Sequence, residues 1–548
     1  ILRSLSPKQR GFYMKFFKKT LLPLLVAFIL LLGSSYGCIL QGLIGGVPSY
    51  SNRKYVAPDE QAIATYIDNT LKLSETPGQE TRLVQARSLV LSSFYNVLTS
   101  YTVASIEYNK DVTNKTAKER YEYISKYANE LQNSVLEMEK KIFSTSYKDY
   151  FVSNLGQEYV DGMLEYKVKS EDLLSLESRE TELASQYSAV AQNEDAAELA
   201  SIYAELVKTR NQIAALNVDA DGKPYENYMD YAYAEVYGRD YTPDDAESFR
   251  ESIIAHIKPV MEKIKASSVI LKSPKTTVSS LKKYASAVIA ETAPSIHSSW
   301  QYMMRYGLYD FELSATKANT SYVTEFHQYG DGFMFINPSG AFVSDLDTVL
   351  HEFGHYNAIF YEDESKSGSL SSSNYDLLET HSQGFELITL PAVKRIFEKY
   401  SLADYYQTYA YNLIYNSVST LLLQSVIDDF EYAVYSAPSE ELTKDFLEKT
   451  FADAFKKYFS SEITLNYYKI PHLYQSPAYC ISYAVSMTFA SEIWISDNNV
   501  DVYLNVVSYG ANHYLSEVYK PLGLENPLLP ETIQTVAKAY DAFADENF

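Results

Sequence analysis

The sequence predicts a mostly helical protein, and three observations carry that prediction. Residues 58–216 contain few glycines or prolines and place apolar side chains three and four positions apart, the spacing of one helix face. The same spacing continues from residue 242 to the end of the sequence. A single segment, residues 331–340, favours a strand instead. With 548 residues, 46% of them hydrophobic, the chain can bury a sizeable core.

Residues 1–37 have the features of an export signal. They contain six cationic residues and no acidic one. From Met14 a basic start is followed by an apolar run at 21–32 and by small residues, which is the order found in secretory signals. The apolar run is shorter than the roughly 20 residues of a membrane-spanning helix. We therefore expect a cleaved signal peptide, with residues 1–13 upstream of the true start.

Cys38 directly follows Gly37, an arrangement that resembles the acylation site of bacterial lipoprotein signals. A diacylated Cys38 would tether the protein to the outer face of the cytoplasmic membrane; plain secretion is the alternative. Residues 38–60, with their Gly, Pro and Ser, are expected to be the tether. Only Cys480 would remain as a free thiol, so we expect no intramolecular disulfide and a packing role for this cysteine.

Residues 61–220 are expected to form an N-terminal helical region. The stretches "ERYEYISKYANELQNSVLEMEKKI" and "DAAELASIYAELVKTRNQIAAL" have apolar stripes typical of antiparallel helical hairpins, and we interpret the region as scaffold. A turn at Asp221-Gly222 and a helix cap at Thr242, followed by Pro243, then mark a boundary. Residues 221–548 form the second region, which carries the motifs described below.

The charge balance argues against nucleic acid as a partner. The chain has 47 Lys+Arg against 70 Asp+Glu, a formal net charge of −23. Binding to a phosphate backbone depends on cationic contacts. The sequence also contains no glycine-rich phosphate loop and no G-x-S-x-G motif, so nucleotide binding and serine hydrolysis have no support.

The segment "DGFMFINPSG" is the predicted strand, because its apolar residues are bounded by Gly and Pro. It comes shortly before the helix that carries the histidine motif. Such a strand could be a sheet edge on which a peptide lies as an added strand. We therefore expect Phe333, Phe335 and Asn337 to hold the backbone of a substrate.

The next segment, "LDTVLHEFGHYNAIFY", suggests a metal site on a helix. Ser344 and Asp347 could cap this helix. His351 and His355 are then one turn apart on one face, where both imidazoles can reach one zinc ion. Glu352 is rotated away from that face, so it is placed to hold the attacking water rather than the ion.

A catalytic zinc ion needs a third protein ligand. The candidates lie in "NYDLLETHSQGFELITLP", a helix expected to be capped near Ser373 or Asn374 and to stop at Pro391. Within it, Glu379, Gln383 and Glu386 share one face. Glu379 is the best ligand on spacing, while the side chains that compete with it are Asp376, His381 and Glu386.

These two segments resemble the thimet oligopeptidase and oligoendopeptidase F family of zinc peptidases. "LDTVLHEFGH" is similar to the family's His-Glu-x-Gly-His helix, and "ETHSQGFE" to its E-x-x-S-Q-x-x-E helix. The first glutamate of the second motif ligates zinc in the family, so the resemblance implies Glu379 as the third ligand of one Zn²⁺ ion. The similarity is clear from about residue 220 to the end of the chain.

A later stretch, "IPHLYQSPAYCISYA", resembles the family's H-x-Y-x-x-P-x-Y-x-x-x-Y segment. The resemblance implies that His472 contacts the substrate or its polarised carbonyl, and that Tyr479 or Tyr483 donates to the oxyanion. Two departures from the pattern are His381, where many relatives have proline, and Cys480, where some carry another tyrosine. The second leaves the choice of oxyanion donor open.

The family architecture implies a large, helical, two-lobed ellipsoid with a deep central channel and a small β-sheet beside the active-site helix. It also implies that residues 221–548 are a catalytic domain that hydrolyses internal bonds of short oligopeptides, here at a bacterial cell surface. No obligate protein partner is expected. The alternative is a catalytically inactive, surface-tethered protein of the same fold that binds peptides.

Overall fold

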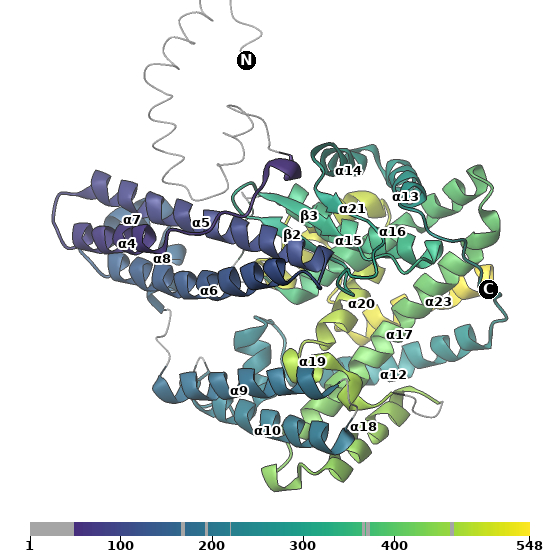
Figure 1. Ribbon diagram of the computed structural model, residues 1–548. Helices are drawn as coiled ribbons and strands as arrows, with labels where there is room; N and C mark the ends of the chain where they lie inside the picture. The colour runs from purple at the N-terminus through teal and green to yellow at the C-terminus, as the bar shows by residue number, and fades with distance from the viewer. Residues whose placement is uncertain are drawn as a thin grey trace, which may run out of the picture. The chain divides into compact units, whose positions relative to one another are not determined.

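The computed structural model describes residues 49–548 apart from 166–169, 192–194, 220, 364–365, 367, 369–372 and 461–464 (Figure 1). The predicted signal peptide and Cys38 lie outside the described residues. Helices dominate, with one small sheet, which confirms the predicted mostly helical class. The chain divides into two compact units.

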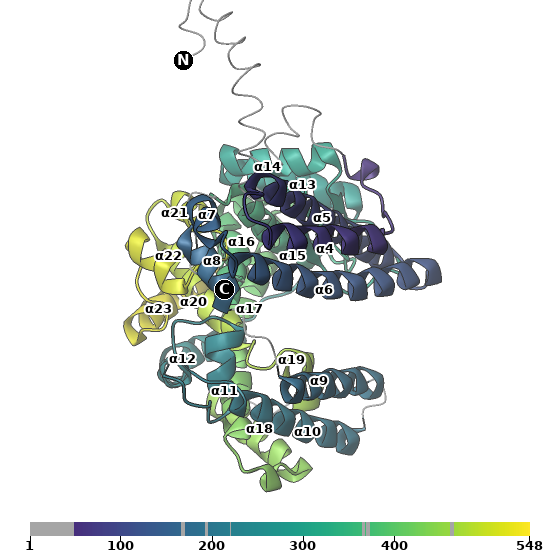
Figure 2. The ribbon, with the colours of Figure 1, turned by 90° about the vertical axis from the view of Figure 1, so that its left-hand side faces the viewer.

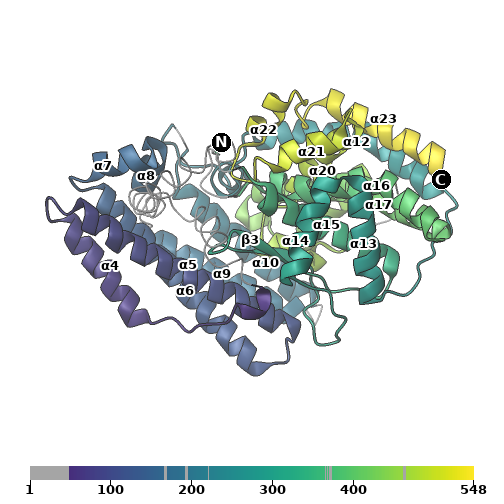
Figure 3. The same cartoon turned by 90° about the horizontal axis from the view of Figure 1, so that it is seen from above.

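Unit 1 comprises the described part of Ile1–Lys167 together with Tyr302–Asn337. After a short 3-10 helix, η3 (Tyr50–Asn52), its helices are α4 (Glu60–Ser74), α5 (Glu80–Lys110), α6 (Lys115–Phe143), α7 (Lys148–Leu155) and α8 (Gln157–Glu165). Helices α4, α5 and α6 lie side by side, as Figure 3 shows. Among the described helices, only α5 is long and apolar enough to cross a membrane. It instead forms part of the core, because a stripe on it packs against α6; the stripe consists of Leu83, Val90, Val97 and Ala104.

The sheet of unit 1 contains β1 (Tyr309–Asp310), β2 (Tyr322–Phe326) and β3 (Asp331–Phe335) in the order β1-β3-β2. Strand β3 pairs parallel with β1 and antiparallel with β2. The predicted strand is thus confirmed, but its expected position at a sheet edge is wrong, because β3 is hydrogen-bonded on both sides. Phe333 and Phe335 are fully buried in this central strand.

Unit 2 comprises the described part of Val168–Gln301 together with Pro338–Phe548. Its first helices are α9 (Glu171–Val190), α10 (Ala196–Ala215), α11 (Tyr228–Tyr231), the π-helix η5 (Ala232–Val236), α12 (Pro243–Ala266) and α13 (Val278–Thr292). Helix α14 (Pro294–Tyr306) crosses from unit 2 into unit 1 along the chain. The next helices are α15 (Phe342–Tyr361), α16 (Tyr375–Lys399), α17 (Ala403–Tyr435), η6 (Ser439–Glu441) and α18 (Lys444–Tyr458). The last are η7 (Tyr467–Lys469), α19 (Pro471–Gln475), α20 (Ile481–Ile495), α21 (Asn499–Val507), α22 (Leu515–Leu522) and α23 (Pro530–Asn547).

Helix α16 is the centre of unit 2, because it packs against α15, α17 and α20 and is buried along most of its length. Helices α9 and α10 also belong to unit 2, where they pack against each other and against α19, with α18 beside α10 (Figure 2). The bounds of the compact units therefore differ from the predicted regions, which placed residues 61–220 together.

Two details of the predicted helix ends are wrong, and one is confirmed. Helix α15 begins at Phe342 without a side-chain cap, because Asp345 instead accepts hydrogen bonds from the backbone of the preceding turn, Ser339 and Gly340. Helix α16 is capped by Asn374, as predicted, but runs through Pro391 to Lys399. A proline inside a helix costs about 3 kcal/mol, and the burial of α16 against its neighbours offsets that loss.

Candidate metal centre

The candidate site depends on the close approach of α15 to α16, and Gly354 makes that approach possible. A Cβ atom at Gly354 would lie 2.5 Å from the carbonyl oxygen of His381 and 2.5 Å from the Cα of Ser382. Any larger residue would push the two helices apart, since both obstructing atoms belong to the backbone. The glycine of the His-Glu-x-Gly-His motif is therefore the residue that brings the histidines of α15 to α16.

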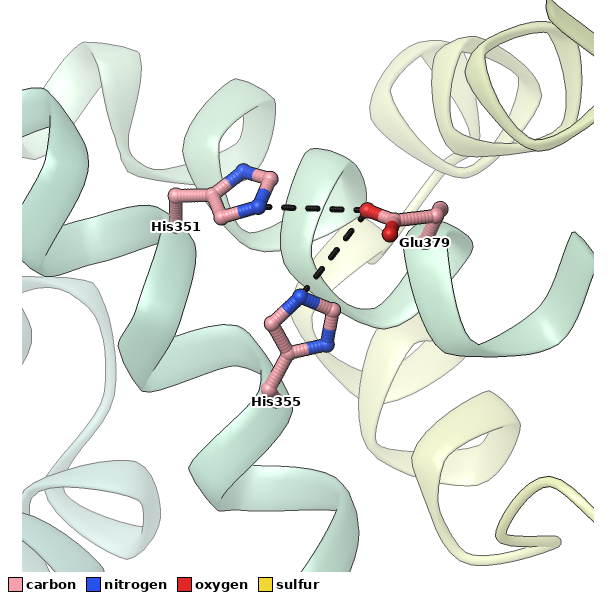
Figure 4. A group of neighbouring side chains, drawn as sticks. All are labelled: His351, His355 and Glu379. Carbon is pink, nitrogen blue, oxygen red and sulfur yellow. Dashed lines mark ion pairs between the residues drawn. The ribbon is translucent and has the colours of Figure 1, made fainter. Parts of the chain in front are cut away.

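Three predicted ligands converge across this contact. The Nε2 atoms of His351 and His355 each lie 3.8 Å from Oε2 of Glu379 (Figure 4). One ligand atom from each of the three residues lies within 4.8 Å of the others, and no other group of this kind occurs among the described residues. Two imidazole nitrogens and one carboxylate oxygen are the donor set of a catalytic zinc site.

The remaining polar atoms of the three side chains are held by neighbours. Nδ1 of His351 hydrogen-bonds Oε1 of Glu386, and His355 has a hydrogen bond to the backbone of Leu378. The hydroxyl of Ser382 donates to Oε2 of Glu379 over 3.3 Å. Such outer contacts fix the orientation of metal-binding imidazoles and leave Nε2 available. The arrangement therefore fits a divalent cation.

The titratable groups at the site act strongly on one another because they lie close together and are at least partly buried. Burial lowers the pKa of His351, but the carboxylate of Glu386 outweighs burial, so the net pKa is raised to about 10. Burial, and then the charge on His351, lower the pKa of His355 to about 3. Burial raises the pKa of Glu379. A cation bound between these groups would offset the cost of burying the carboxylates.

Glu352 lies beside the ligands without being one of them. Its side chain is buried, with 6% exposure, and burial raises its pKa to about 7. A carboxylate with a pKa near neutrality can both accept and return a proton. Both properties match the predicted role of Glu352 as a general base.

The competing third ligands take other positions. Glu386 bonds the outer nitrogen of His351 instead of facing the two Nε2 atoms. The carboxylate of Asp376 faces Arg239, with 3.9 Å between Oδ1 and Nε. His381 is fully buried, and neither ring nitrogen has a hydrogen-bond partner among the described residues. Glu379 is therefore the carboxylate that the fold brings to the histidines.

The aromatic residues predicted near the site form one cluster next to Glu379. The hydroxyl of Tyr479 donates to Oε1 of Glu379 over 3.2 Å. The ring of His472 stacks on Tyr479 at 5.4 Å, and the ring of Tyr483 meets Tyr479 edge-on at 5.0 Å. Burial lowers the pKa of His472 and raises that of both tyrosines, so the two phenols stay protonated and can donate.

A cavity of about 430 Å³ opens beside this cluster. The cavity is lined by His472, Tyr479 and Tyr483. Its lining also includes Tyr237, which directly follows η5, and Tyr375, the first residue of α16. A bound molecule in this cavity would therefore reach the donors beside Glu379 directly.

The remaining predictions about single residues have different outcomes. Burial raises the pKa of the Cys480 thiol, which agrees with a packing role. Phe333, Phe335 and Asn337 belong to unit 1, and their predicted contact with a substrate backbone stays a prediction. The site also contains a contact that sequence reasoning missed, namely the contact of Glu386 with His351. Glu386 lies seven residues, or about two helical turns, after Glu379 on the same face of α16, and this spacing could have indicated the contact with His351.

Comparisons with known proteins give one family model and several solved structures of similar fold. The model of peptidase family M3 matches residues 295–537. A comparison with curated proteins finds no match. The solved structure of PZ peptidase A with an inhibitor has a TM-score of 0.72 at 17% sequence identity, and the alignment covers 90% of this chain and 99% of that chain.

Two further solved structures share the fold. A protein assigned as oligoendopeptidase F from Bacillus anthracis strain Ames has a TM-score of 0.69 at 19% identity, covering 91% of this chain and 98% of its own. An M32 carboxypeptidase from Deinococcus radiodurans R1 has a TM-score of 0.61 at 11% identity, and the alignment covers 89% of this chain and 100% of that chain. The fold is therefore one that both endopeptidases and carboxypeptidases use.

Proposed function

We propose that the protein is a zinc-dependent endopeptidase that hydrolyses internal bonds of short oligopeptides, because residues 295–537 match the model of peptidase family M3, a family of metallopeptidases. The observation that carries this proposal is the convergence of His351, His355 and Glu379 beside a buried Glu352. The ligands and the general base are all present, which favours an enzyme over an inactive peptide-binding protein.

Each residue of the site then has a task. His351, His355 and Glu379 would hold the ion, which when bound supplies Lewis acidity that activates water and polarises the scissile carbonyl. Glu352 accepts a proton from the attacking water and passes it to the leaving amine. Tyr479 or Tyr483 would donate its hydroxyl to a developing oxyanion, a contact that gains strength only in the transition state.

His472 has a second task in this scheme. Its ring stacks on Tyr479, and burial favours its neutral form. A neutral imidazole that lines the cavity can donate a hydrogen bond to a substrate carbonyl. His472 would therefore orient the peptide.

The experiment that tests the proposal is the mapping of cleavage products. Purified protein is incubated with a set of short, internally quenched peptides, with and without a zinc chelator. We expect cuts at internal bonds that disappear with the chelator. Release of single C-terminal residues alone would assign carboxypeptidase activity instead. Zinc binding without any cleavage would favour the inactive, peptide-binding alternative.

We further propose that the protein acts outside the cytoplasmic membrane, anchored through Cys38. The support is the order of features in residues 14–38, a basic start, an apolar run and a cysteine after small residues. Two acyl chains give lasting attachment. We expect labelled fatty acid to be incorporated into the parent expressed in a bacterium and not into Cys38→Ala. Equal labelling of both would reject the anchor, while release of the unlabelled parent into the medium would indicate plain secretion.

A further inference from the structure

The turn that carries Tyr479 has a backbone conformation that the surrounding structure must maintain. Ala478 has a φ angle of +61°, in the left-handed region that residues other than glycine rarely adopt. Its side chain is fully buried. A strained, non-glycine residue persists only where neighbouring contacts determine its conformation. Since Ala478 directly precedes Tyr479, these contacts also determine where the phenol points.

Two buried side chains hold both backbone polar atoms of this residue. The carbonyl oxygen of Ala478 accepts a hydrogen bond from Nη2 of Arg239 over 2.9 Å, and its N–H donates to Oε1 of Glu431 over 3.0 Å. The same Nη2 donates to the hydroxyl of Ser482 over 2.8 Å. Tyr237, whose ring lies under the Arg239 guanidinium at 4.6 Å, donates to the carbonyl of Pro477.

The other side of the Arg239 guanidinium faces the metal-binding helix. Its Nε lies 3.9 Å from Oδ1 of Asp376, and both side chains are 1% exposed. Asp376 is in the first turn of α16, three residues before Glu379. One planar cation therefore lies between the turn that carries Tyr479 and the turn that leads to Glu379. Arginine suits this position because its donors have a fixed planar geometry.

We propose that Arg239 is a positioning residue, which fixes the Tyr479 hydroxyl relative to Glu379 through the Ala478 turn. Arg239 is buried and lies outside the group of candidate ligands and donors, so it acts through Ala478 and Asp376. The inference rests on the proposed function, because it assigns Tyr479 to the oxyanion. A displacement of a catalytic group by about 1 Å can lower the rate on the order of 100-fold.

A double-mutant cycle tests this coupling. The variants are Arg239→Met, Tyr479→Phe and the double variant, each assayed with a peptide that the parent cleaves. We expect Arg239→Met to lower kcat about 100-fold with KM changed less than about threefold. In the Tyr479→Phe background the same substitution should lower kcat by less than about threefold, because the group it positions is already absent. Arg239→Lys, which keeps a donor for Ala478, should recover part of the activity.

A matched control is Arg250→Met. Arg250 is another buried arginine of unit 2, but it pairs with Asp428 on α17. Its effect on kcat should be the same in the parent and Tyr479→Phe backgrounds. If Arg239→Met lowers kcat by equal factors in both backgrounds, Arg239 does not act through Tyr479 and the inference is wrong. If Arg239→Met does not fold, Arg239→Lys takes its place, and its effect on kcat is compared in the parent and Tyr479→Phe backgrounds in the same way.

Hydrogen exchange gives a readout that does not depend on activity. We expect Arg239→Met to increase amide exchange in the peptide 473–483 selectively, whereas Arg250→Met should not. If the parent cleaves no peptide, the proposed function fails, and selective exchange would still support the effect of Arg239 on the turn. Unchanged exchange in 473–483 would overturn the inference even in an active enzyme.

Discussion

Glu352→Gln is expected to lower kcat for peptide hydrolysis by about 10³-fold and to leave zinc affinity within about threefold of the parent. Glutamine has the shape of glutamate but cannot accept a proton, so the variant removes only the predicted general base. Glu352 lies beside His351 on α15, and its burial, which raises its pKa to about 7, places it among the groups able to exchange protons near neutral pH. The measurement is kcat and KM for one quenched peptide, together with zinc content.

Glu492→Gln is the matched control for this substitution. Glu492 is also a buried glutamate of unit 2 with its pKa raised to about 7 by burial, but it lies on α20 and accepts a hydrogen bond from the backbone of Glu525. We expect its kcat to stay near that of the parent. If Glu352→Gln cleaves peptides as fast as the parent does, the assigned base is wrong.

Glu379→Gln is expected to abolish hydrolysis at low zinc concentration, because it removes the only charged ligand of the proposed set. The loss of a group that merely supports a ligand costs 10- to 100-fold in metal affinity, so the loss of the ligand itself should cost more than about 100-fold. Glutamine has nearly the shape of glutamate, and its single carbonyl oxygen can still accept one of the two hydrogen bonds that Tyr479 and Ser382 donate to Glu379, which limits the change in packing. The measurement is the hydrolysis rate as a function of free zinc.

Asp376→Asn is the control for Glu379→Gln. It shows whether the loss of zinc affinity is specific to Glu379 or follows from neutralising another buried acid of α16. Asp376 lies three residues before Glu379 in α16, but it faces Arg239 instead of the histidines. We expect the zinc concentration that supports half-maximal activity to stay near the parent value in this variant. A similar shift in both variants would mean that the first turn of α16, and not the carboxylate of Glu379, controls metal binding.

The sequence was sufficient to place the two histidines of the candidate site because their geometry is local. His351 and His355 are one turn apart on a helix whose apolar periodicity is clear, so their common face follows from the helix repeat alone. Glu379 could not be chosen from spacing alone, since Asp376, His381 and Glu386 were also possible third ligands. The resemblance to a family selected it, and the crossing of α15 and α16 at Gly354 explains physically why this carboxylate meets the histidines.

Features that depend on long-range contacts could not be predicted in the same way. Whether β3 is central or at an edge depends on its pairing with β1 and β2, and nothing within 331–340 encodes those partners. The continuation of α16 through Pro391 likewise depends on the packing of α16 against its neighbouring helices. Arg239 was missed because its partner Ala478 is 239 positions away in the sequence.

A competitive zinc titration against a chromogenic chelator shows whether His351, His355 and Glu379 together bind one divalent cation. We expect the parent to bind one zinc ion per chain and Glu379→Gln to bind it more than about 100-fold more weakly. Equal affinity and stoichiometry in the parent and in Glu379→Gln would mean that Glu379 is not a ligand and that the ion is held elsewhere.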